Sequence, residues 1–229
     1  MSVFSSGVFG VESVKSVSVT EGESVSLNSD LTEIQRDDEI MWKFENIMIA
    51  KIYGKDNKSR FYEDSADGRF RDRLKLDHQT GSLSITNTRT TDSGLYKVTS
   101  KSSGTPLNIF SLTVYAHLPV PVITRDSSQN SSSSSSSSSS YCSLVCSVVN
   151  VGYVTLSWYK GNSLLSSISV SDLNRSLSLH LECLDDSYSC VVNNPISNQT
   201  QHLNNTELCQ PCSGTSVIIF NVYVHTHSH

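Results

Sequence analysis

The chain has 229 residues, which is enough for two small domains of roughly 100 residues each. Its 17 Lys and Arg against 22 Asp and Glu give a net charge of -5, and the basic residues are scattered. Nucleic-acid binding requires basic residues gathered on one surface, so composition argues against that class of function.

The cysteines and glycosylation sequons both indicate an oxidising, extracellular setting. All six cysteines lie in the second half of the chain, and a clustered even number is typical of disulfide-bonded proteins. We predict N-glycosylation where Asn opens an N-x-Ser/Thr triplet. These positions are Asn57, Asn130, Asn174, Asn198 and Asn204.

The two ends of the chain carry no recognisable targeting segment. Residues 1–13 lack the charged start of a signal peptide. Within the tail at 211–229, the apolar run "SVIIFNVYV" has nine residues, whereas a membrane-spanning helix needs about 20. We therefore expect an incomplete or alternatively spliced product.

Short alternating strands are predicted through the first half of the chain. Apolar and polar residues alternate at 16–29, 39–45, 82–86, 95–100 and 108–115, with turn-rich pieces between them. No helical stripe of useful length interrupts them. This pattern predicts a β-sandwich over residues 14–117.

The segment "DSGLY" at 92–96 has the residue spacing found on the sixth strand of immunoglobulin domains. A disulfide cysteine normally follows two residues after the Tyr, but here Val98 stands in its place, and Ser29 replaces the other cysteine. We predict a core of Trp42, Tyr96 and Val98 without a disulfide. Losing such a bond costs roughly 2–5 kcal/mol, which additional apolar contacts can offset.

A joint between domains is predicted at Pro119 and Pro121, because proline keeps the chain extended. The serine run Ser131–Ser140 reads either as an interdomain linker or as an expanded loop between the first two strands of a second domain. Strand-like segments on both sides of the run favour the loop. We predict that the run is disordered, because serine buries too little apolar surface to order it.

The second half repeats the immunoglobulin pattern with its cysteines present. Cys146, Trp158 and Cys190 have the Cys…Trp…Cys spacing, and Tyr188 lies two residues before the second cysteine, as in a tyrosine corner. We therefore predict a constant-type domain over 118–210. The fold class is all-β, with two tandem immunoglobulin-like sandwiches.

A variable-type domain without its disulfide, followed by a constant-type domain with extra cysteines, resembles the signalling lymphocytic activation molecule (SLAM) family of leukocyte receptors, in its bony-fish form. The residues that carry the resemblance lie at 69–98 ("RFRDRLKLDHQTGSLSITNTRTTDSGLYKV") and 187–200 ("SYSCVVNNPISNQT"). The resemblance covers about 14–210. As in variable-type domains, we expect Arg73 to pair with Asp92.

The resemblance also implies two disulfides in the second domain. They are Cys146–Cys190, between the sheets, and Cys142–Cys209, which ties the first strands to the last. Six cysteines allow fifteen pairings, so residue spacing alone does not select these. Cys183 and Cys212 are left over, and Cys183 continues the inward alternation of the preceding leucines, as a small core side chain would.

No motif for catalysis or cofactor binding is found. The C-x-x-C at Cys209–Cys212 lacks the second ligand pair of a zinc site and the helix of a redox site, so we interpret it as a stalk near the membrane. Nucleophile elbows, phosphate loops and paired carboxylates are absent from the sequence. We expect no enzyme, no cofactor, no metal, no small-molecule substrate and no nucleic acid.

A candidate partner-binding face follows from the strand that contains Trp42. With Trp42 directed inward, alternate residues of this strand and of the strand at 95–100 point outward; Lys51 and Tyr53 are added without a fixed orientation. Lys and Glu also cover ordinary solvated sheet surfaces, but SLAM-type receptors dock head to head through this face. The predicted face comprises Glu39, Met41, Lys43, Glu45, Lys51, Tyr53, Lys97, Thr99 and Lys101.

The expected function is that of a leukocyte cell-surface receptor that acts in adhesion and immune-cell signalling. Its partner would be a related immunoglobulin-superfamily receptor on an apposed cell, bound homophilically or heterophilically through the first domain. The expected location is the extracellular side of the plasma membrane. A soluble decoy or secreted splice form, and a matrix protein without a signalling partner, are the alternatives.

Overall fold

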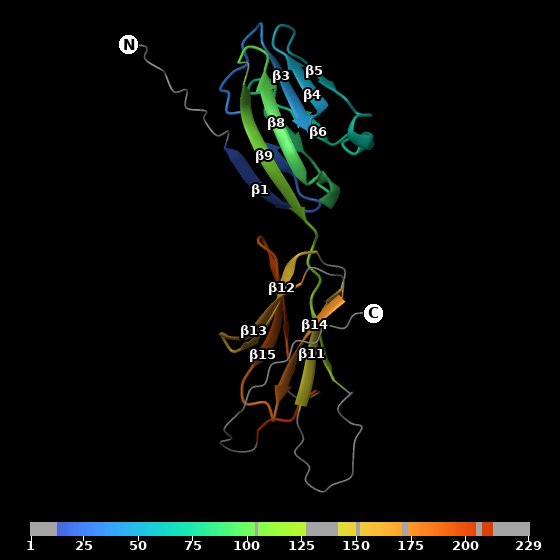
Figure 1. Ribbon diagram of the computed structural model, residues 1–229, viewed down its shortest axis with the longest axis vertical. Helices are drawn as coiled ribbons and strands as arrows, with labels where there is room; N and C mark the ends of the chain where they lie inside the picture. Colours follow the sequence, from blue (N-terminus) through green and yellow to red (C-terminus); the bar gives the residue numbers. More distant parts are fainter. Residues whose placement is uncertain are drawn as a thin grey trace, which may run out of the picture. The chain divides into compact units, whose positions relative to one another are not determined.

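The computed structural model describes residues 13–103, 105–126, 142–149, 152–170, 174–204 and 208–212. In this part of the chain the regular structure consists of strands and two single-turn 3-10 helices, η1 (Ala66–Gly68) and η2 (Thr90–Asp92). The chain separates into two compact units, Met1–Ala116 (unit one) and His117–His229 (unit two), as Figure 1 shows.

Unit one is a sandwich of a six-stranded and a three-stranded sheet. The six-stranded sheet has the order β1 (Val14–Thr20), β9 (Pro106–Tyr115), β8 (Gly94–Ser100), β3 (Glu39–Phe44), β4 (Ile47–Tyr53) and β5 (Lys58–Phe61). The other sheet has the order β2 (Val25–Leu27), β7 (Leu83–Ile85) and β6 (Leu74–Leu76). The strands β4 and β5 extend the larger sheet in the manner of a variable-type immunoglobulin domain.

The core of unit one forms around Trp42, which is fully buried between the sheets. The indole N–H of Trp42 donates to the carbonyl of Gly81, at 2.8 Å. Val98 lies directly opposite Trp42 on the neighbouring strand and is also fully buried. An apolar side chain therefore fills the position where a disulfide cysteine normally stands.

Ser29 occupies the other cysteine position of unit one. Its register partner follows from Leu27, which pairs with Leu83, because two more residues along each chain bring Ser29 opposite Gly81. Its hydroxyl donates to the carbonyl of Thr80 at 2.6 Å, and its side chain is buried. A satisfied hydroxyl thus replaces the sulfur without leaving a buried polar group unpaired.

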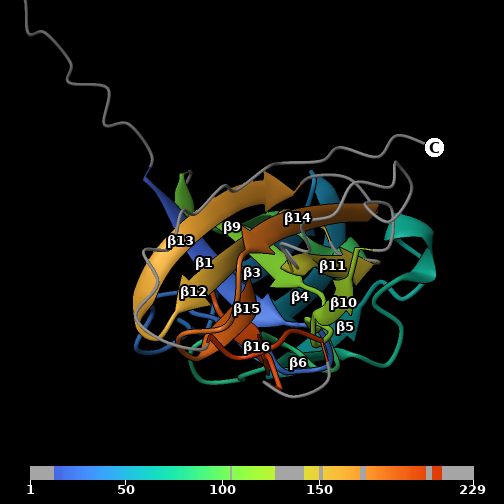
Figure 2. The ribbon, with the colours of Figure 1, turned by 90° about the horizontal axis from the view of Figure 1, so that it is seen from below.

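Unit two is a sandwich of a three-stranded and a four-stranded sheet, seen from one end in Figure 2. The smaller sheet has the order β10 (Val122–Arg125), β11 (Cys142–Val149) and β14 (Asn174–Leu181). The larger has the order β13 (Ser163–Val170), β12 (Val154–Lys160), β15 (Tyr188–Asn193) and β16 (Asn198–His202). The all-β, tandem-sandwich fold class predicted from the sequence is confirmed.

Trp158 is the central core residue of unit two, as Trp42 is of unit one. Its indole N–H donates to the carbonyl of Leu177 at 2.9 Å, and Leu177 is the register partner of Cys146. Cys146 is bonded to Cys190, which lies opposite Trp158 on β15. The same indole-to-carbonyl bond therefore marks the disulfide position in both units.

The serine run Ser131–Ser140 and Asn130 lie outside the described residues. The strands that precede and follow this stretch, β10 and β11, are antiparallel partners in one sheet of unit two. The stretch therefore connects two neighbouring strands within this unit.

Three disulfides tie unit two together, and one of them was not expected. Cys142 is bonded to Cys209, as the family resemblance implied, and Cys183 is bonded to Cys212. The interpretation of Cys183 as an unpaired core side chain is therefore wrong. The strand β14 ends at Leu181, so the inward alternation stops before Cys183, which is partly exposed.

The segment 208–212 is held against unit two by backbone contacts as well. The amide of Leu184 donates to the carbonyl of Gln210 at 3.0 Å, and the amide of Cys212 donates to the carbonyl of Leu184 at 2.9 Å. All six cysteines are used in the three disulfides. This segment is therefore a fixed part of unit two, and its C-x-x-C is neither a redox pair nor a free stalk.

Candidate partner-binding face

The outer surface of the six-stranded sheet in unit one collects the residues predicted for partner binding. On β3 and β8, Met41 lies opposite Thr99, and Lys43 lies opposite Lys97. Ile40, Trp42 and Phe44, the residues between them on β3, are buried. Because neighbouring side chains of a strand point to opposite faces, the residues paired with each other here share the outward side.

The strand β4 contributes Lys51 and Tyr53 to the same side. Glu39 is the register partner of Tyr53, and Met41 is the partner of Lys51. The register shifts by one residue between Trp42 and Lys43, at a β-bulge. The bulge decides the orientation, because an unshifted hairpin would have directed Lys51 inward.

Glu39 is bound by two lysines from its own face. Its carboxylate accepts from Lys51 at 2.5 Å and lies 3.3 Å from the ammonium of Lys101. The hydrogen bond from Lys51 is the main cause that lowers the pKa of Glu39. Lys51 also lies over the ring of Tyr53, 4.7 Å from its centroid. These four side chains form one connected cluster at the upper end of the face.

Glu45 is also engaged within unit one. It follows β3 with a left-handed backbone (φ 45°), and its Oε1 accepts from the amide of Leu95 at 2.7 Å. Gly94 permits this approach, because a Cβ at that position would lie 2.6 Å from Oε1 and 2.7 Å from the ring of Phe44. The glycine of the D-S-G-L-Y motif therefore positions Glu45 at the lower end of the face.

Lys43 and Lys97 differ from the other charged groups of this face. They are register partners and both are half-buried. None of the ion pairs found among the described residues includes either of them. Side chains directly opposite on antiparallel strands have Cβ atoms about 4.5–5.5 Å apart, and like charges at that separation are unfavourable.

Apolar side chains surround these two lysines, and the sequence reading did not include them. Met48 is the register partner of Lys43, and Ile109 is the partner of Lys97 on the next strand. Ile47 and Leu95, near the lower end, are 44% and 47% exposed. The alternation of β8 that directs Lys97 outward also directs Leu95 outward, whereas the positions of Met48 and Ile109 beside the lysines follow only from the pairing of strands.

Asp38 holds together the upper edge of the face, the end at which β3 begins and β8 ends. Its carboxylate accepts from the hydroxyls of Ser100 (2.5 Å) and Ser102 (2.8 Å) and from the amides of Glu39 and Ser102. Burial opposes the ionisation of Asp38, but the hydrogen bonds outweigh it and lower its pKa. The start of β3 is thereby tied to the turn that leads from β8 towards β9.

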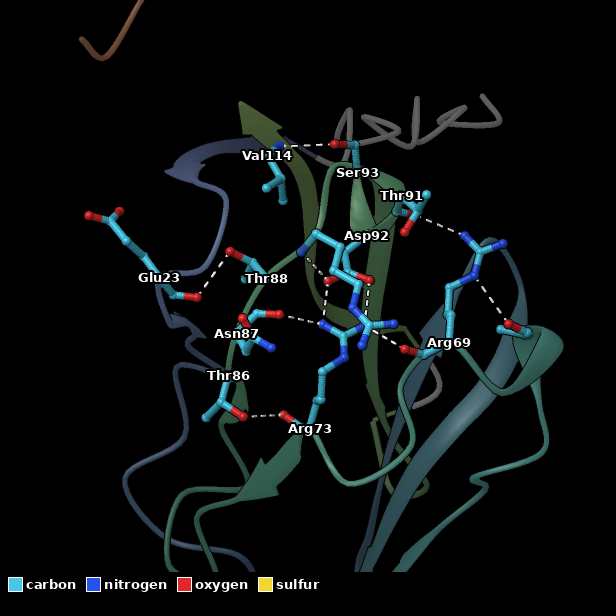
Figure 3. Close-up of polar contacts among 12 residues, drawn as sticks. Glu23, Arg69, Arg73, Thr86, Asn87, Thr88, Thr91, Asp92, Ser93 and Val114 are labelled. Carbon is cyan, nitrogen blue, oxygen red and sulfur yellow. Dashed lines mark hydrogen bonds and ion pairs between the residues drawn. The ribbon is translucent and has the colours of Figure 1, made fainter. Parts of the chain in front are cut away.

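Arg73 and Asp92 fix the opposite edge, as Figure 3 shows. The guanidinium reaches both carboxylate oxygens, at 2.6 and 2.8 Å, and the side chains are 7% and 0% exposed. The hydroxyl of Tyr96 donates to the backbone carbonyl of Asp92 at 2.7 Å, which forms a tyrosine corner. In unit two, the hydroxyl of Tyr188 instead donates to the carboxylate of Asp185.

The predicted glycosylation sites are distributed over both units. Asn57 is exposed in the turn between β4 and β5, where it has a left-handed backbone (φ 48°). Asn198 and Asn204 are exposed in unit two. Asn130 and the side chain of Asn174 lie outside what the structure describes.

The described residues form neither a metal-binding cluster nor a membrane-spanning helix. They contain no cluster of three or more His, Cys, Asp and Glu arranged to hold a metal ion. None of the helices in the described part of the chain has the length and apolar character needed to cross a bilayer.

Sequence comparison relates the chain to a leukocyte receptor. It is 28% identical over 142 residues to the human natural killer cell receptor 2B4, a match that covers 61% of this chain and 38% of the relative. The chain thus spans well under two thirds of the relative's length. No family model matches the chain.

Structural comparison relates the fold of the chain to two solved structures. The CD2-binding domain of CD58 (lymphocyte function-associated antigen 3) superposes with a TM-score of 0.60 over 88% of this chain and 99% of that structure, at 19% identity. The fold is that of tandem immunoglobulin domains. The ectodomain of mouse nectin-like molecule 4 gives a TM-score of 0.53 over 83% of this chain and 65% of that structure, at 14% identity.

Proposed function

We propose that this chain is the ectodomain of a leukocyte cell-surface receptor of SLAM type, which binds a related immunoglobulin receptor on an apposed cell. The observation that carries the proposal is the outer face of the six-stranded sheet in unit one. Lys43 and Lys97 lie there half-buried, with no ion pair to any residue that the structure describes, beside Met48 and Ile109. A second protein surface can supply the counter-charge that these lysines lack, and it can remove the apolar side chains from water.

The comparisons support the class of protein. The similarity to natural killer cell receptor 2B4 is to an immune receptor, and one solved structure that superposes over most of the chain is the CD2-binding domain of CD58. A face of this kind suits weak, selective recognition. Mispaired charges penalise wrong partners, and multiple contacts between two cells add up to stable adhesion.

The proposal is tested by binding of the full chain to a panel of immunoglobulin-superfamily receptor ectodomains from leukocytes. Surface plasmon resonance compares wild type with the double variant Lys43→Glu/Lys97→Glu. We expect at least one receptor to bind the wild type and the double variant to lose that binding while its circular dichroism spectrum and thermal midpoint stay unchanged.

A matched control separates the face from a general charge effect. Lys75→Glu/Arg125→Glu changes the net charge by the same amount, because it replaces two cations, here exposed ones, by two carboxylates. Lys75 lies on β6 of the other sheet, and Arg125 lies on β10 of unit two. Equal binding of both double variants to the same receptor would show that the partner docks elsewhere.

A further inference from the structure

The carboxylates of the proposed face have partners within unit one, whereas the two lysines at its centre have no ion-pair partner among the described residues. Glu39 is held by Lys51 and Lys101, and Glu45 is held by the amide of Leu95. Lys43 and Lys97, at the centre, have no such partner among the described residues. The face therefore offers free cations while its carboxylates are already occupied.

The outer strand of the sheet adds to this imbalance. On β5, Lys58 is the register partner of Tyr53, and Arg60 is the partner of Lys51, so both lie on the outward side and both are exposed. The chain as a whole carries a net charge of -5, with 17 basic and 22 acidic residues. An excess of cations on this one surface is thus opposite in sign to the rest of the protein.

A second copy of this chain is a poor match for such a face. If two copies met face to face, the central lysines would approach other lysines, or carboxylates that are already engaged. Lysines excluded from water in this way would each lack a counter-charge, and burying an unpaired charge is costly. Met48 and Ile109 beside them would make the contact drier and the repulsion stronger.

We infer that the partner is a different chain, whose docking surface presents free carboxylates opposite Lys43 and Lys97 within an otherwise apolar patch. The inference rests on the proposed function and adds to it the chemistry of the partner. Recognition is heterophilic, and self-association through this face is blocked by the two lysines. The acidic surface would be drawn to the face over about a Debye length, which is about 8 Å at physiological salt.

The test uses the chain itself as the probe. Sedimentation velocity at low ionic strength is measured for the wild type alone, for Lys43→Glu/Lys97→Glu alone, and for their equimolar mixture. We expect the wild type to be monomeric and the mixture to form a heterodimer, because the variant then supplies the missing carboxylates. Association in the mixture should be at least about tenfold tighter than that of the wild type alone.

Each outcome of the sedimentation experiment either supports or overturns the inference. A mixture that associates, and that dissociates as salt is raised, supports the inference. A wild-type homodimer that the double variant abolishes would overturn it, and so would a mixture that remains monomeric. The control Lys75→Glu/Arg125→Glu mixed with wild type should stay monomeric. A receptor bound by wild type and lost in the double variant still supports the proposed function if this test fails.

Discussion

Arg73 and Asp92 form a buried ion pair that joins the two sheets of unit one. Arg73 directly precedes β6 of the smaller sheet, and Asp92, the last residue of η2, lies two residues before β8 of the larger. The guanidinium also donates to the carbonyls of Asn87 and Arg69, at 3.0 and 2.5 Å. The pair is thus part of a network that closes the lower edge of the sandwich.

Asp92→Ala is expected to lower the free energy of unfolding of unit one by about 3–5 kcal/mol, because it leaves a buried guanidinium without its counter-charge. Urea denaturation measures the change. The control is Asp64→Ala, which removes an exposed Arg–Asp pair with Arg71. An exposed pair contributes about 0–1 kcal/mol, so equal losses in the two variants would contradict the assigned role of Asp92.

The hydrogen bonds to Asp38 predict a dependence of stability on pH. The pKa of Asp38 is lowered in the folded state, so its contribution is complete above the unfolded-state value of about 3.9 and is lost as the pH falls through the folded-state value. Asp38→Asn should cost about 1.5–3 kcal/mol at pH 7, and the difference from wild type should shrink as the pH falls below the folded-state pKa of Asp38. Urea midpoints measured across this range provide the test. Asp37→Asn, which removes the exposed neighbouring carboxylate, is the control variant, and a constant gap between Asp38→Asn and wild type would rule out the Asp38 carboxylate as its cause.

Gly81 is expected to tolerate no larger side chain. Its φ is +75°, and an added Cβ would lie 3.2 Å from Ile34 and 3.3 Å from Ile40. Gly81→Ala should therefore combine a cost of about 1–2 kcal/mol for the left-handed backbone with a further 1–3 kcal/mol for overpacking. Gly22→Ala is the matched control, because Gly22 has a φ of +86° and no atom within 4 Å of an added Cβ. Equal thermal midpoints for the two variants would exclude the packing contribution.

The disulfide pattern of unit two is open to direct chemical mapping. Proteolysis without reduction should release three linked pairs, Cys142–Cys209, Cys146–Cys190 and Cys183–Cys212. Cys183→Ser/Cys212→Ser should cost less than the roughly 2–4 kcal/mol of a typical disulfide, because the neighbouring bond at Cys209 already holds the segment in place. A peptide that links Cys146 to Cys183 would contradict the pattern.

Much of the fold follows from the sequence because its strongest signals are local. Trp42 and Trp158 mark the third strand of each sandwich, and burial in alternation around Trp42 is visible in the residue pattern of β3. The positions of Ser29 and Val98 follow from their distance to these markers. Such spacings depend on the chain's own periodicity and need no knowledge of distant contacts.

Features that depend on contacts between distant segments were not accessible in this way. The orientation of Lys51 is set by a β-bulge, and the position of this bulge cannot be assigned from residue types. The bond from Cys183 to Cys212 depends on the chain after β16 returning to the end of β14, and six cysteines allow fifteen pairings. The opposition of Lys43 and Lys97 likewise appears only when β3 and β8 are placed in register.

The double attachment of segment 208–212 has a mechanical consequence for unit two. Pulling on an edge strand from its end normally separates its hydrogen bonds one after another, and β16 is such an edge. Here tension applied beyond Cys212 enters the sandwich through two covalent bonds, at Cys183 after β14 and at Cys142 on β11. The load therefore reaches the opposite sheet directly and bypasses β16.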